Sequence, residues 1–95
     1  MSPQVKQLLG EMARIMVDLS DVDREIMEKR LDGVRKDLHL EVELHRRDSH
    51  GSRPVFRRLV AEADVIVKNL NQLYEQRRDL CRRLSEIYEE VQVPA

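Results

Sequence analysis

Two histidine–glutamate pairs come nearest to a metal-binding or catalytic pattern in this chain. His39 and Glu43 are four residues apart, and so are Glu41 and His45, so each pair would share one turn of a helix. On a helix, however, the two pairs point to opposite sides and cannot build one four-ligand site. Surface ion pairs are the simpler interpretation. We therefore predict no metal site and no cofactor.

Cys81 and Arg77 are the other candidates for chemistry. A single cysteine excludes an internal disulfide and a cysteine-based zinc site. Cys81 lies in an apolar row, where a small inert hydrophobe is expected. In the second half of the chain, apolar residues recur every three or four positions and form the seam of a predicted helix, and Arg77 is the one charged residue in that seam. A single charged residue is too few polar groups for an active site inside a helical bundle. We predict that the chain is not an enzyme and has no catalytic residues.

Arginines are concentrated around the one clear turn of the chain, with only Asp48 against them. Such a cluster could bind phosphate, RNA or an acidic protein, and His45 and His50 could add charge in mildly acidic conditions. A solvated loop end is the simpler interpretation. Phe56 belongs to the seam and offers bases no stacking platform, so a small dimeric nucleic-acid-binding regulator is the alternative function only. The candidate anion-binding residues are Arg46, Arg47, Arg53, Arg57 and Arg58.

The composition of the 95 residues favours long amphipathic helices. Charged residues make up 37% and aromatic residues 3%, with three glycines and three prolines, which is a poor mixture for a β domain. Seventeen basic and eighteen acidic side chains nearly cancel, so bulk charge indicates neither a nucleic-acid nor a membrane partner. No apolar run approaches the ~20 residues of a membrane span, and no signal-peptide pattern is present. We expect a cytoplasmic protein.

The second half of the chain predicts a helix over about 54–92. Its apolar residues recur at alternating gaps of three and four, which is typical of a coiled coil or bundle, and only Arg77 interrupts them. Pro54 marks the start of the helix, because the residue before proline resists helical geometry. The seam consists of Phe56, Leu59, Ala63, Ile66, Leu70, Leu73, Arg77, Leu80, Leu84, Ile87 and Val91.

The first half predicts a helix over about 3–47, with Ser2 as its N-cap and Pro3 in its first turn. The seam of this helix is regular as far as Ile26 and comprises Val5, Leu8, Met12, Ile15, Leu19, Val22 and Ile26. After Ile26 the apolar positions step by one residue, to Met27, Leu31, Val34, Leu38 and Val42. A helix absorbs such a slip by local unwinding.

Two local alternatives stay open in this first helix. Ser20 to Asp23 has the spacing of a capping box, so a new helix could begin there. Residues 38–45 alternate apolar and polar, which is also typical of a strand, although an isolated strand is not stable. If 38–45 is helical, Leu40 and Leu44 fall on the face opposite the seam.

A turn over 48–53 between two long helices predicts an antiparallel hairpin that fills a single domain, 1–95. The two seams match along their length when Leu8 faces Val91 and, beyond the slip, Val34 faces Ile66. The same match places Arg77 opposite Asp23. We predict either an ion pair that fixes the register or an Arg77 that extends to solvent.

The helix expected over about 54–92 carries a second apolar row, with members seven residues apart, that one hairpin cannot cover. A stripe of this width suits three or four helices, so the all-α, coiled-coil-like hairpin is expected to dimerise into a four-helix bundle or to accept a partner's helices. The predicted function is a non-enzymatic protein-interaction module acting as adaptor, assembly factor or chaperone. Its predicted contact residues are Val60, Val67, Tyr74, Cys81 and Tyr88, together with Leu40 and Leu44.

Overall fold

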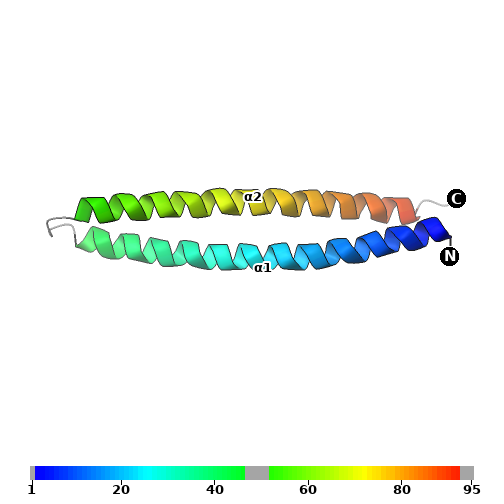
Figure 1. The fold of residues 1–95 in the computed structure, drawn as a ribbon, viewed down its shortest axis with the longest axis horizontal. Helices are drawn as coiled ribbons and strands as arrows, with labels where there is room; N and C mark the ends of the chain where they lie inside the picture. The colour runs from blue at the N-terminus through cyan, green and yellow to red at the C-terminus, as the bar shows by residue number, and fades with distance from the viewer. Residues whose placement is uncertain (1, 47–51, 93–95) are drawn as a thin grey trace. The chain divides into compact units, whose positions relative to one another are not determined.

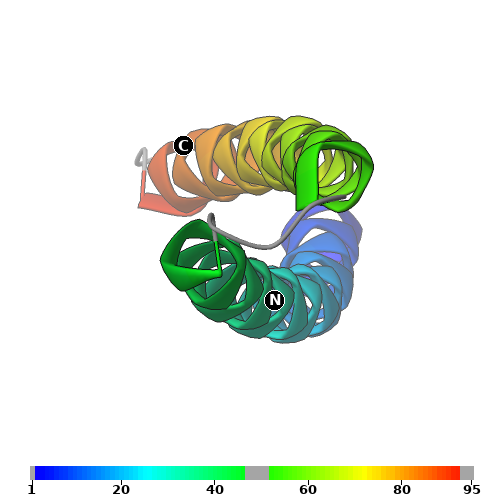
Figure 2. The same ribbon diagram turned by 90° about the vertical axis from the view of Figure 1, so that its left-hand side faces the viewer.

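Two long helices make up the described part of the chain in the computed structural model. The structure describes residues 2–46 and 52–92, in which α1 spans Pro3–His45 and α2 spans Ser52–Gln92. These residues contain no strand, so the fold is an all-α helical hairpin, and each helix is continuous in both views (Figures 1 and 2). Neither helix is long and apolar enough to cross a membrane.

The start of α1 is capped as its sequence predicts. The Val5 backbone N–H donates a hydrogen bond of 3.2 Å to Ser2 Oγ, and the Lys6 N–H donates one of 3.0 Å to the Ser2 carbonyl. These bonds satisfy backbone donors that have no partner within the helix.

The two local alternatives are both decided in favour of a continuous helix. Ser20 lies inside α1 and residues 38–45 are helical, because strong helix formers surround both segments and no second strand is present within the described residues. α1 ends at His45, two residues before the expected end, and α2 begins at Ser52. Pro54 therefore lies within the first turn of α2, where its missing N–H costs nothing. The predicted turn over 48–53 falls mostly outside the described residues.

The chain divides into two compact units. The first combines Met1–Glu25 with Leu73–Ala95 and is called the terminal unit here; the second, Ile26–Gln72, is called the central unit. In the terminal unit the helices run antiparallel and the seams meet as predicted. Ile15, Leu73 and Ile87 are buried, and the other apolar seam residues are partly buried.

The predicted slip of the α1 seam does not occur in the central unit. Ile26 is buried, but Met27, Leu31, Val34, Leu38 and Val42 are all exposed. The three-four rhythm instead continues without a break, and it places a mixed set of residues on the inner face of α1, toward α2. These partly buried residues are Lys29, Gly33, Lys36, Leu40 and Glu43.

A side-chain contact at Gly33 and an ion pair at Lys36 accompany this phase of α1. Gly33 faces Ile66 closely enough that an added Cβ would lie 3.8 Å from Ile66 Cγ2. Lys36 lays its aliphatic stem along the interface and its ammonium group meets Glu62. The expectation that Leu38 faces α2 and Leu40 points away is therefore wrong, and the two residues exchange roles.

Candidate protein-interaction surface

An exposed apolar stripe on α1 is the most distinctive surface of the central unit. Met27, Leu31, Val34 and Leu38 follow gaps of four, three and four, so they share one helix face. Their exposed fractions lie between 52% and 72%. We call these four residues the outer stripe. A shallow depression of about 470 Å³ follows its first three members and is also lined by Glu28 and Arg30.

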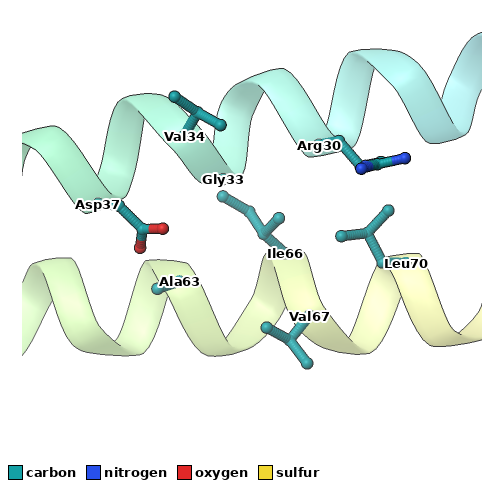
Figure 3. A pocket seen from close by; sticks show the side chains of 8 residues that line it. All are labelled: Arg30, Gly33, Val34, Asp37, Ala63, Ile66, Val67 and Leu70. Atoms are coloured by element: carbon teal, nitrogen blue, oxygen red, sulfur yellow. The ribbon is translucent and has the colours of Figure 1, made fainter.

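A groove between α1 and α2 adjoins the outer stripe. Its volume is about 280 Å³, and Val34 of the stripe and Val67 of α2 both line it. Figure 3 shows Ile66 reaching toward the backbone at Gly33, where the missing side chain leaves the groove open. The remaining lining residues are Arg30, Asp37, Ala63 and Leu70.

Arg30 and Asp37 give the groove two opposite charges. Both extend from α1 toward α2, one on each side of Gly33 (Figure 3). Both residues are exposed, and neither forms an ion pair within residues 2–46 and 52–92. This charged and apolar rim was not predicted from the sequence, because the expected slip turned Val34 inward.

The second row of α2 is largely exposed, as a contact surface requires. Val60 and Val67 are exposed in the central unit; in the terminal unit, Tyr74 and Tyr88 are exposed and Cys81 is partly buried. Their role in binding a partner stays a prediction.

The last two predicted contact residues differ from each other in exposure. Leu44 is exposed, whereas Leu40 lies partly buried on the inner face of α1. Only Leu44 therefore presents the surface that was expected of both.

The terminal unit contains the ion pair predicted between Arg77 and Asp23. Arg77 Nε donates a hydrogen bond of 2.7 Å to Asp23 Oδ1, and this bond raises the pKa of Arg77. The side chains remain 46% and 49% exposed, so Arg77 both pairs with Asp23 and extends toward solvent. Arg77 Nη1 also lies 3.8 Å from Cys81 Sγ. Whether the pair fixes the register stays a prediction.

A stronger connection between the helices of the terminal unit was missed by the sequence analysis. Arg83 forms a two-pronged pair with Glu11, with Nε–Oε1 at 2.8 Å and Nη2–Oε2 at 3.0 Å. Its Nη1 also lies 3.3 Å from Glu86 and 3.5 Å from Glu90. The hydrogen bond from Arg83 lowers the pKa of Glu11, and the carboxylates raise the pKa of Arg83. Glu11 and Arg83 each lie next to a seam residue, and opposite charges beside the two seams are the signal that could have suggested the pair.

The central unit contains a matching connection between Lys36 and Glu62. The Lys36 ammonium group donates a hydrogen bond to Glu62 Oε2, and Arg58 Nε lies 3.8 Å from Glu62 Oε1. The hydrogen bond from Lys36 is the main reason that the pKa of Glu62 is lowered, and partial burial opposes it.

The candidate anion-binding arginines are partly matched by carboxylates on their own helices. Arg46 Nη1 lies 3.8 Å from Glu43, and Arg58 lies near Glu62. Arg53 and Arg57 are exposed, and Arg47 lies outside the described residues. In the part of the chain that the structure describes, no group of three or more histidine, cysteine or acidic side chains is placed to hold a metal ion.

No protein-family model, curated protein or solved structure is significantly similar to this chain.

Proposed function

We propose that this chain is a non-enzymatic helical interaction module, an adaptor, assembly factor or chaperone-like protein that acts by forming a bundle with further helices. The observation that supports this proposal is the outward-facing outer stripe. In the central unit, α1 turns its most apolar face away from α2, while Lys29 and Lys36 face α2. An amphipathic helix whose apolar face has no partner within its own fold marks a surface suited to another chain.

The free energy available from this surface is of the right order for an interface. Fully burying one Leu, Met or Val side chain contributes roughly 1.5–3 kcal/mol, so four side chains that are between 52% and 72% exposed offer about 1–2 kcal/mol each. Association costs several kcal/mol in lost translational and rotational freedom. The outer stripe therefore needs the adjoining groove and Val67 to give a stable complex.

Glutamine substitutions in the outer stripe test the proposal. Leu31→Gln with Leu38→Gln keeps helix propensity but removes the apolar face. The matched control is Val65→Gln, since Val65 is also exposed but lies about 200° around α2 from Val67. Light scattering and native mass spectrometry measure the assembled mass, for the chain alone and after it is added to extract of its source cells.

We expect the native chain and the control to assemble and the double variant to remain a monomer. A native chain that stays monomeric both alone and in the extract contradicts the interaction module.

The alternative proposal is a nucleic-acid-binding regulator, and the exposed Arg53 and Arg57 support it. Phosphate binding releases counterions, so affinity for RNA or DNA should fall steeply with salt and should drop further in the Arg53→Ala, Arg57→Ala variant. Gel-shift titrations over a range of salt concentrations measure this dependence. Affinity that ignores salt excludes the alternative. A cytoplasmic location is part of both proposals, and the single cysteine, which can form no internal disulfide, is compatible with it.

A further inference from the structure

We infer that the outer stripe and the groove beside it bind a second copy of this chain, in a two-fold antiparallel arrangement in which Arg30 of each copy meets Asp37 of the other. The inference rests on the proposed interaction module and names its partner. Three observations carry it: the exposed area of the chain, its net charge, and the placement of the two groove charges.

The exposed area of the chain is large enough to supply a stable dimer interface. The chain exposes 7826 Å², whereas a compact monomer of 11.2 kDa exposes about 5,700 Å². The excess of roughly 2,100 Å² is more than twice the ~800 Å² that each partner buries in a standard interface. The apolar residues of the outer stripe and the groove lie within this exposed surface.

The net charge permits self-association. The formal charge is −1 at pH 7, so two copies repel each other only weakly. A partner of strong single-sign charge would gain no general attraction from such a surface. This favours a second copy over a highly charged macromolecule.

The groove charges select the antiparallel orientation. Arg30 and Asp37 are seven residues apart on one side of α1, with Gly33 and Val34 between them. A two-fold axis beside Gly33 and Val34 brings Arg30 of each copy to Asp37 of the other, and so makes two reciprocal ion pairs. In a parallel arrangement, Arg30 would meet Arg30 and Asp37 would meet Asp37, which is unfavourable.

The apolar residues suit the same antiparallel pairing. In an antiparallel helix pair with Arg30 beside Asp37, the heptad places Val34 of each copy against Leu31 of the other, and Leu38 against Met27. The groove that Gly33 and Val34 help to line lies beside this contact and has room for side chains of the second copy. The inferred interface thus has an apolar centre with a charged pair at each end.

Charge reversal provides a sharp test. Arg30→Asp and Asp37→Arg are made singly and together, and sedimentation equilibrium with native mass spectrometry gives the dimer dissociation constant of each purified chain. Circular dichroism confirms that each variant is helical. Either single variant creates two like-charge contacts, so we expect its dissociation constant to rise by about tenfold or more. The double variant restores both ion pairs in reversed sense and should dimerise as the native chain does.

Mixing the two single variants provides a second, independent measurement. An equimolar mixture of the Arg30→Asp and Asp37→Arg chains should form the heterodimer, because each copy then offers the charge that the other lacks, and the two masses identify it. Single variants that dimerise as the native chain does, or a mixture that forms no heterodimer, overturn the inference. If the native chain still assembles, such results contradict only the inferred dimer and not the proposed interaction module. A native chain that binds only a different protein likewise contradicts the inference that the partner is a second copy, but not the interaction module.

Discussion

At the scale of single residues, Arg83 is the best-connected side chain of the terminal unit. It joins Glu11 on α1 to Glu86 and Glu90 on its own helix. One guanidinium lies within 3.5 Å of three carboxylates and offsets part of their charge, so its removal leaves those carboxylates to repel one another more strongly. The pair between Arg82 and Asp79, by contrast, lies within α2 and is more exposed.

We expect Arg83→Met to lower the melting temperature by a few degrees, and the matched Arg82→Met to change it much less. Salt screens exposed charges, so the effect of Arg83→Met should shrink at high ionic strength. Thermal unfolding followed by circular dichroism at low and high salt measures both effects. Equal destabilisation by the two variants would show that the cross-helix pair contributes nothing specific.

The two lowered carboxyl pKa values predict how stability depends on pH. Hydrogen bonds from Arg83 and Lys36 hold the pKa values of Glu11 and Glu62 below the ordinary value of 4.5. The folded chain therefore favours their charged forms. Their contribution to stability is fully present above pH 4.5 and is lost as the pH falls through the lowered folded values.

Acid titration of the melting temperature tests this linkage. Between about pH 5 and pH 3 the native chain should lose stability. The double variant Glu11→Gln, Glu62→Gln should be less stable than the native chain at neutral pH. Its stability should fall less on acidification, because the two carboxyl groups whose protonation weakens the fold are absent. Glu28→Gln, an exposed position with no ion pair in the described residues, serves as the control. A double variant that loses as much as the native chain on acidification contradicts the assignment.

At the scale of the helices, Gly33 is a point where α1 can be strengthened. A helical glycine is less favourable than alanine by roughly 0.5–1 kcal/mol. An added Cβ at Gly33 would meet Ile66 Cγ2 at 3.8 Å, an ordinary contact distance, and one at Gly10 would meet nothing within 4 Å. The structure therefore leaves room for a methyl group at both positions.

We expect Gly33→Ala to raise the free energy of unfolding by about 0.5–1 kcal/mol, and Gly10→Ala to raise it by a similar amount. Urea unfolding measures both. Gly10→Ala is the control for helix propensity alone, because its methyl group contacts nothing. A destabilised Gly33→Ala chain beside a stabilised Gly10→Ala chain would mean that the helices must approach more closely than the structure places them.

The helices were predictable where apolar residues and interhelical contacts coincide. Ser2 and the regular α1 seam up to Ile26 gave the cap, the hairpin and the Arg77–Asp23 pair. Beyond Ile26 the apolar residues no longer lie on the face of α1 that meets α2. A prediction based on hydrophobicity therefore assigns the wrong face of α1 to the contact with α2. Lys36 is not recognisable as an inner-face residue, because only its partner Glu62 on the other helix makes that position acceptable.

The candidate surface was predictable only in part for the same reason. The row of α2 was recognisable because its members repeat every seven residues beside a regular seam. The outer stripe was hidden, since Val34 and Leu38 fit an inward seam equally well when α1 is considered alone. Which face of an amphipathic helix meets its neighbour is decided by packing, and packing is not contained in the pattern of one helix.

At the scale of the whole molecule, self-association should make the apparent stability depend on concentration. Because a dimer that forms only from folded chains draws the equilibrium toward folding, the melting temperature of the native chain should rise with protein concentration. The same scan on Arg30→Asp should show a weaker rise. Scanning calorimetry over a hundredfold range of about 1–100 µM covers the relevant affinities. A melting temperature independent of concentration contradicts a dimer in that range.

The lysines on the inner face of α1 have a consequence for amide hydrogen exchange. In the central unit, α1 contributes few buried apolar contacts to α2, so its backbone amides from about Lys29 to Glu43 should open locally at lower free energy than those near Ile15. Binding at the outer stripe would then slow exchange in this segment most. The outer stripe thus lies on the least stable part of α1, and association would protect the backbone amides of that part most.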